Sequence, residues 1–203
     1  MIIRWSLTVP SDPFTLTVFC GSRHGARPIY TEAAAELGQL AAAHNIRIAY
    51  GGGRLGLMGV LADAALAAGG EVVGIIPGYL TQHEVLHPGL TETFIVADLF
   101  ARKQRMLDIG DAFASLPGGF GTLDEFFEVV SWIQLGQLDA PNVLVNIGGY
   151  FDSLLGLVSE VVAEDFARAS HLDRIQHVAS VPALIALLED RAVATQGPED
   201  ALR

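Results

Sequence analysis

A glycine-rich stretch, PGGFGTLDE over residues 117–125, combines residue types that can bind an anion with a carboxylate that can do chemistry. Glycines let the backbone approach a ligand closely, and a helix that follows them offers unpaired N–H groups and the positive end of its dipole. This arrangement suits a phosphate group. The carboxylate of Glu125 could then activate water or stabilise a cationic transition state.

Thr122 and Glu125 also permit a purely structural interpretation. Thr-x-x-Glu is the pattern of a capping box, in which Thr122 would be the helix N-cap and Glu125 would reach back to it. Glu125 would then lie in the first helical turn, where the dipole favours an ionised carboxylate. The capping box accounts for the spacing but not for the three glycines before it, so both interpretations stay open.

Basic residues gather in DLFARKQRM, residues 98–106, which reads as a helix start with Asp98 as its N-cap. Arg102 and Arg105 are three residues apart and are predicted to share a face. A solvated basic face would explain them, but the cluster holds three of the twelve basic residues of an acidic chain. We therefore expect an anion site here.

Lys103 is the only lysine in the chain and raises the possibility of a pyridoxal-phosphate enzyme. Its place among arginines in a predicted helix argues against this, and no cofactor is predicted. Cys20 has no assignable base nearby in the sequence, so we expect a small buried residue rather than a nucleophile.

HEVLH, residues 83–87, matches the pattern of zinc proteases, which place two histidines four apart on one helix face. Pro88 directly follows His87, and a residue before proline is pushed away from helical angles. Gly89 further discourages a continuous helix. We predict no metal site, although a zinc protease, with bound zinc and loss of activity to chelators, is the alternative that these letters raise.

The bulk composition limits the class of protein. The chain has 203 residues, 51% of them apolar, and a formal net charge of −11. No basic tract is present, which argues against nucleic-acid binding, and no apolar run is long enough for a membrane span. A single cysteine and the absence of a signal-peptide pattern favour a cytoplasmic protein.

Short apolar runs alternate with helix-length segments along the chain. The predicted strands are 14–20, 46–50, 71–77, 93–97, 111–117 and 142–147, and the predicted helices are 29–44, 57–68, 98–109, 122–135, 151–167 and 182–190. Continuously apolar strands indicate burial on both faces, hence a parallel sheet. We predict a single-domain α/β fold, with a doubly wound, Rossmann-like, mostly parallel sheet covered by helices on both faces. We expect the domain to span 14–191, with an N-terminal extension over 1–13 and a C-terminal tail over 192–203.

Ligands of such sheets bind outside the carboxyl ends of the strands. Three glycine-containing turns follow predicted strands: FCGSRHG at 19–25, YGGGRLGLMG at 50–59 and the stretch at 117–125. Neither of the last two is a Walker loop, because no Gly-Lys-Ser/Thr follows. Two such loops in one sheet favour a compact phosphorylated ligand between them.

These stretches together resemble the Lonely Guy family, the cytokinin riboside 5′-monophosphate phosphoribohydrolases, often mislabelled as lysine decarboxylases. PGGFGTLDE is similar to the PGGxGTxxE motif of that family. HPGLTE, ARKQRM, SWIQLGQLDAP and NIGGYFDSLL continue the likeness in the same order over roughly residues 15–190. The first loop departs from the pattern, with Arg23 and His24 where the family usually has small residues.

The resemblance implies a homodimer that hydrolyses the N-glycosidic bond of adenosine monophosphate or its N6-prenylated form, with the site near the dimer interface. It implies catalytic roles for Arg102 and Glu125 and a phosphate cradle around Thr122. The substrate-binding residues that it implies are Ser22, Gly53, Glu84, Arg102, Lys103, Gly118, Gly119, Gly121, Thr122, Asp124 and Ser131. A non-catalytic nucleotide carrier on the same fold is the main alternative.

Overall fold

The computed structural model describes residues 13–81 and 86–195, and residues 191–195 by their backbone alone. The described chain forms one 7-stranded sheet in the order β4-β3-β2-β1-β5-β6-β7, with every pairing parallel. The strands are β1 (Thr15–Phe19), β2 (Arg47–Tyr50), β3 (Val72–Pro77), β4 (Glu92–Val96), β5 (Ala112–Ser115), β6 (Asn142–Val145) and β7 (Ile175–Val178). The predicted α/β fold is confirmed.

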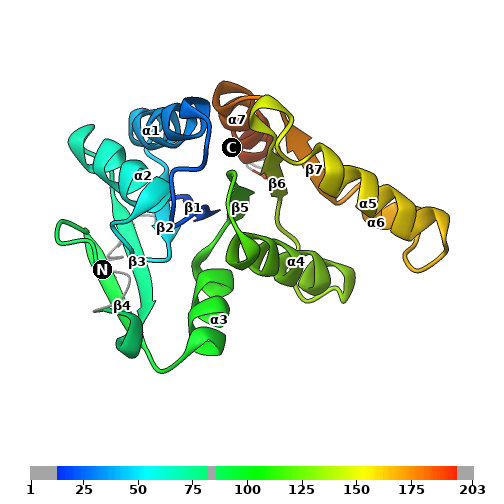
Figure 1. Ribbon diagram of the computed structural model, residues 1–203, viewed down its shortest axis with the longest axis horizontal. Coiled ribbons are helices and arrows are strands. Elements are labelled where there is room, and N and C mark those ends of the chain that lie inside the picture. The colour runs from blue at the N-terminus through cyan, green and yellow to red at the C-terminus, as the bar shows by residue number, and fades with distance from the viewer. Residues whose placement is uncertain (1–12, 82–85, 196–203) are drawn as a thin grey trace, which may run out of the picture.

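Helices cover both faces of this sheet (Figure 1). They are α1 (Pro28–Ala43), α2 (Gly56–Ala67), α3 (Leu99–Ile109), α4 (Phe120–Gln134), α5 (Asp152–Ala163), α6 (Ala169–Leu172) and α7 (Val181–Thr195), with short 3-10 turns η1 (Gly78–Leu80) and η3 (Ile147–Gly149). Side chains of α1, α2 and α7 share one core cluster, and those of α3 and α4 share another on the opposite face. A third cluster joins α4 to β6 and the start of α5.

The central strands are largely apolar because helices cover both of their faces. β1, β3, β5 and β6 are buried at every position, whereas the edge strand β4 is exposed or half-buried. This difference follows from the sheet order, since only an edge strand lacks a neighbour on one side.

The structure differs from the predicted elements at two places in the C-terminal half of the chain. Residues 151–167 do not form one helix: α5 ends at Ala163, and Asp165 has a left-handed φ of 62°, a conformation that stops a helix. The strand β7 was not predicted. It is short and half-buried, so its periodicity in the sequence is weak.

The strand order reverses beside β1. Successive strands β2, β3 and β4 lie on one side of it, while β5, β6 and β7 lie on the other. The loops after β1 and β5 therefore leave the sheet at neighbouring positions, with Phe19 aligned to Ser115. Ligands of doubly wound sheets bind at such a switch point.

No helix within the described residues is long and apolar enough to cross a membrane. The predicted N-terminal extension and C-terminal tail fall largely outside those residues, so these two boundaries stay predictions.

Candidate active site

Backbone hydrogen bonds of Gly21 connect three loops at the switch point. Its N–H donates to the carbonyl of Pro117 over 3.2 Å, and its carbonyl accepts from the N–H of Leu57 over 3.0 Å. Gly21 thereby ties the loop after β1 to the loop after β5 and to the start of α2. A side chain is disfavoured at this position because a Cβ atom would lie 3.0 Å from the Arg23 carbonyl oxygen.

A cavity of about 350 Å³ opens beside these loops. Residues of α3 and of the start of α4, which are far apart in the sequence, both line it. Its lining comprises Cys20, Gly21, Ser22, Met58, Leu80, Leu99, Arg102, Lys103, Gly119, Phe120, Gly121, Thr122, Asp124 and Glu125. The volume suits a small molecule, and the lining combines charged side chains with the apolar side chains of Met58, Leu80 and Leu99.

The helix α4 begins at Phe120, with Gly119 as its N-cap and no side-chain cap. The capping-box interpretation, which requires Thr122 as the N-cap, is therefore excluded, and Glu125 lies in the second turn rather than the first. Three N–H groups of the first turn, those of Phe120, Gly121 and Thr122, have no backbone acceptor among the described residues. Such groups at a helix start bind anions.

Thr122 is buried, and its hydroxyl packs against Gly118. A Cβ atom at Gly118 would overlap the Thr122 Oγ1 atom and would lie 2.9 Å from the Gly21 backbone nitrogen. The glycine at 118 is thus required by the close contact of two loops, which explains one glycine of the stretch on structural grounds. Gly119 and Gly121 have open space instead, on the side where a ligand could lie.

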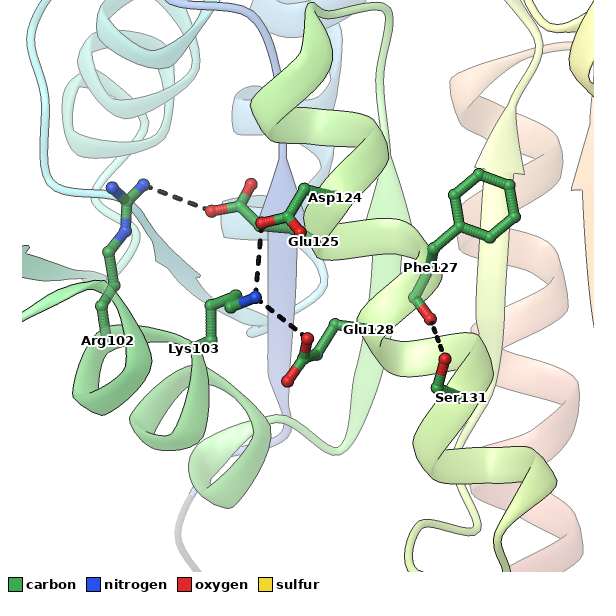
Figure 2. A network of polar contacts seen from close by, with 7 residues as sticks. All are labelled: Arg102, Lys103, Asp124, Glu125, Phe127, Glu128 and Ser131. Carbon is green, nitrogen blue, oxygen red and sulfur yellow. Dashed lines mark hydrogen bonds and ion pairs between the residues drawn. The ribbon is translucent and has the colours of Figure 1, made fainter.

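Arg102 and Glu125 both line the cavity and point toward each other (Figure 2), with Nη2 and Oε1 separated by 3.4 Å. Both side chains are largely buried, with exposed fractions of 10% and 14%. Asp98 begins α3 as predicted, since its carboxylate accepts from the N–H of Ala101 over 2.9 Å. The two helices therefore hold an arginine and a carboxylate in a position to act on one bound molecule.

The loop after β2 makes room for Arg102. A Cβ atom at Gly51 would overlap the Arg102 guanidinium, so any side chain there would displace it. Arg105, three residues further along α3, contacts a different residue. Its guanidinium stacks on the ring of Phe94, 4.2 Å from the ring centre, and does not line the cavity.

Lys103 bridges the two helices by ion pairs. Its Nζ atom donates to Glu128 Oε2 over 2.9 Å and to Asp124 Oδ2 over 3.3 Å (Figure 2). Partial burial lowers the pKa of Lys103, but the hydrogen bond to Glu128 and the charges of Asp124 and Glu128 outweigh it and raise the pKa above its ordinary 10.5. A Schiff-base lysine needs the opposite shift, which argues against the pyridoxal-phosphate alternative.

Comparison with known proteins identifies the family. A family model described as "Possible lysine decarboxylase" matches residues 58–188. A cytokinin riboside 5′-monophosphate phosphoribohydrolase of Rhodococcoides fascians is 44% identical over 164 residues, which cover 80% of this chain and 83% of that protein. One of Arabidopsis thaliana is 41% identical over 175 residues, covering 86% and 82%. The chain belongs to the Lonely Guy family.

Solved structures with this fold are more distant in sequence. A molybdenum cofactor binding protein of Rippkaea orientalis aligns over 90% of this chain and 99% of its own, with a TM-score of 0.69 and 21% identity. The Moco carrier protein of Chlamydomonas reinhardtii aligns similarly, with a TM-score of 0.69 and 20% identity. At this identity the likeness concerns the fold alone.

Most residues that the Lonely Guy resemblance singles out come together around the cavity. Its lining includes Ser22, Arg102, Lys103, Gly119, Gly121, Thr122, Asp124 and Glu125. Gly118 instead borders a neighbouring hollow, which shares Gly21, Ser22, Gly119 and Phe120 with the cavity.

Two more of the predicted residues, Ser131 and Gly53, do not line the cavity. Ser131 lies farther along α4, where its exposed hydroxyl donates to the Phe127 carbonyl over 2.8 Å (Figure 2). Gly53 lies in the loop after β2, where it forms an isolated antiparallel bridge with Leu86. Glu84 lies outside the described residues.

Only Leu86 and His87 of the HEVLH segment lie within the described residues, and His87 is not part of a helix. His83 lies outside the described residues, while the backbone of His87 donates to the Gly52 carbonyl over 2.9 Å. The ring of His87 is already engaged, with Nε2 2.9 Å from Asp63 Oδ1 and Nδ1 accepting from the Gly89 N–H over 3.1 Å. No cluster of three metal-ligating side chains occurs within residues 13–81 and 86–190.

Cys20 is buried in the cavity wall. Burial, and secondarily the charge of Glu125, raise the pKa of its thiol far above the ordinary range. A thiol that stays protonated is a poor nucleophile, as expected from the sequence.

Sequence reasoning missed several residues of the site. Glu128 could have been found, because it lies four residues after Asp124 and shares its helix face. Met58, Leu80 and Leu99 carry no local signal, since only the packing of α2, η1 and α3 brings them to the same cavity.

Proposed function

We propose that this protein hydrolyses the N-glycosidic bond of adenosine monophosphate or an N6-prenylated adenosine monophosphate. The products are the free base and ribose 5-phosphate. One observation carries the proposal: an uncapped helix start and the Arg102–Glu125 pair line the same cavity. The activity in the names of its relatives requires both a phosphate site and a charged group at the sugar.

The phosphate lies at the start of α4 in this proposal. The N–H groups of Phe120, Gly121 and Thr122 donate to its oxygens, and the helix dipole favours its negative charge. Ser22 lines the same cavity as Gly119 and adds its hydroxyl as a further donor. No Walker lysine is needed because one helix start and its glycines suffice for a monophosphate.

Bond cleavage occurs at the Arg102–Glu125 pair. The bond between the base nitrogen and C1′ breaks, its electron pair leaves with the base, and the sugar takes on oxocarbenium character. The carboxylate of Glu125 stabilises this positive charge and orients the water whose oxygen bonds to C1′. One proton of that water finally neutralises the departing base. Arg102 holds the Glu125 carboxylate in place and contacts the substrate.

The base points toward the apolar wall of the cavity. Met58, Leu80 and Leu99 supply this wall, which suits a planar ring or an attached prenyl chain. Lys103 and Asp124 form the polar rim beside it and contact the remaining parts of the nucleotide.

The protein acts as a homodimer in this proposal, with the partner near the cavity mouth. Phe100 and Phe120 flank the site with exposed fractions of 79% and 92%, far more than large apolar side chains usually show. Light scattering coupled to gel filtration tests this point, and a mass of 21.6 kDa would show a monomer instead.

A panel of nucleotides tests the activity. Purified protein is incubated with adenosine monophosphate, prenyl-adenosine monophosphate, and the matching nucleosides without phosphate, and the free bases are separated by chromatography. We expect release of base from the monophosphates and little from the nucleosides. Tight binding of a monophosphate without any release of base would refute hydrolysis and favour the carrier alternative.

A further inference from the structure

A tyrosine from a distant loop is hydrogen-bonded to the glycine-rich stretch. The hydroxyl of Tyr150 donates to the carbonyl oxygen of Gly118, 32 residues earlier in the chain. Tyr150 follows η3, beyond the carboxyl end of β6, whereas Gly118 follows β5. A residue that follows β6 thus holds the loop that follows β5, beside the hollow that Tyr150 and Gly118 both line.

The ring of Tyr150 is fixed although it is partly exposed. It meets Tyr30 edge to face, with ring centres 5.5 Å apart, and Phe151 in the same way at 4.9 Å. The Asn146 side chain secures this turn, since its Oδ1 accepts from the Phe151 N–H over 2.6 Å and its Nδ2 donates to Asp152 over 2.7 Å. The hydroxyl therefore has a defined direction before any ligand binds.

The hydrogen bond also sets the direction of a donor on the other side of the peptide. All peptide bonds among the described residues are trans, and the C=O and N–H of one trans peptide point in opposite directions. With the Gly118 carbonyl turned toward Tyr150, the N–H of Gly119 is turned away from it. Gly119 is the N-cap of α4 and lines the cavity of the Arg102–Glu125 pair.

The peptide between Gly118 and Gly119 has little intrinsic resistance to rotation. Two consecutive glycines have no Cβ atoms to restrict their backbone angles. Gly119 has no neighbour within 4 Å of the position that a Cβ atom would take, so packing does not hold it from that side. An external hydrogen bond is then the natural means of fixing this peptide plane.

We propose that Tyr150 is a positioning residue for phosphate recognition, which holds the Gly118–Gly119 peptide so that the Gly119 N–H joins the donors at the start of α4. This inference rests on the proposed function, because it assumes that the phosphate of the nucleotide lies there. Tyr150 acts through the backbone and contacts no reacting atom.

The test is the Tyr150→Phe substitution, which removes only the hydroxyl. Its matched control is Tyr30→Phe, because Tyr30 belongs to the same ring cluster but its hydroxyl accepts from Arg27 Nη1 over 3.4 Å and does not reach Gly118. Calorimetry gives the Kd for adenosine monophosphate, with every protein compared in a Glu125→Gln background so that little nucleotide is consumed, and competition with it gives the affinity for adenosine. We expect Tyr150→Phe to weaken binding of the monophosphate about tenfold, the effect of losing one hydrogen bond to a charged group.

We expect adenosine affinity, the temperature midpoint of unfolding and the Tyr30→Phe variant to stay close to wild type. In turnover assays the loss should appear in KM, with kcat changed little. An equal loss for adenosine and its monophosphate, or equal behaviour of the two variants, would overturn the positioning role. A wild-type protein that binds the monophosphate but releases no base overturns the hydrolase proposal alone, because the binding comparison remains valid.

Discussion

Glu125→Gln is the substitution that most directly probes the proposed chemistry. Glutamine has nearly the shape of glutamate and can still accept a hydrogen bond from Arg102, so the fold of the site should survive. What it removes is the negative charge, in a place where the side chain is only 14% exposed. Water cannot replace that charge efficiently in such surroundings.

The size of the effect on kcat follows from the distance between the Glu125 carboxylate and the positive charge that develops on the sugar. Unit charges about 4 Å apart attract by roughly 4 kcal/mol at an effective dielectric constant of about 20. Each ~1.36 kcal/mol of lost transition-state stabilisation slows a reaction about tenfold, so complete loss corresponds to roughly a thousandfold. The amide dipole retains part of the stabilisation. We therefore expect kcat to fall by about 10² to 10³, the range seen when one stabilising group is removed from an active site.

The assay is release of adenine from adenosine monophosphate at saturating substrate, with the unfolding midpoint measured in parallel. Glu128→Gln is the control, because Glu128 lies one turn further along α4 and pairs with Lys103 without lining the cavity. It should cost less than about tenfold in kcat. A folded Glu125→Gln protein with kcat within about tenfold of wild type would refute the electrostatic role of Glu125.

Other predictions follow from the same geometry. Gly118→Ala should lower the unfolding midpoint, because its Cβ atom would overlap Thr122. Gly119→Ala should leave the midpoint unchanged but weaken nucleotide binding, because its methyl group would fill open space in the cavity. Calorimetric unfolding curves and nucleotide-binding curves separate the two effects. Lys103→Met should destabilise the fold at neutral pH. The difference in unfolding free energy from wild type should vanish as the pH rises beyond 10.5 through the raised pKa of the folded state, because a raised pKa stabilises the fold only while the amine is protonated. Urea unfolding from pH 7 upward measures this difference. Chelators should leave base release unchanged, because the His87 ring is held by Asp63 and Gly89, and elemental analysis should find no stoichiometric zinc.

Much of the site could be predicted because its residues belong to short, recognisable sequence patterns. Asp98 caps α3 as its position before the helix indicated, and glycine-rich turns do follow β2 and β5. The start of α4 was placed two residues too late, because Thr122 has the residue type of an N-cap while Gly119 takes that position. Glycine is nearly as acceptable as threonine at an N-cap, and it leaves the first N–H groups of the helix without a side-chain acceptor, so that a ligand can bind them.

Predictions that depended on which way a side chain points were less successful. Arg102 and Arg105 lie three residues apart on one helix, but only Arg102 reaches the cavity, since Gly51 leaves space for its guanidinium and Phe94 attracts the other. Spacing along a helix defines a shared face, yet it does not say which neighbouring element each side chain will meet.

By itself, the sequence determined the alternation of buried strands and helices, the family, and the residue types that can bind a phosphate and stabilise a cation. These features depend on local composition and spacing, which can be recognised directly in the sequence. Only the tertiary structure decided which of those residues share a cavity. The pairing of Arg102 with Glu125 and the support of Gly118 by Tyr150 arise because parallel strands bring their carboxyl ends to one edge of the sheet, and that order is set by packing between distant segments.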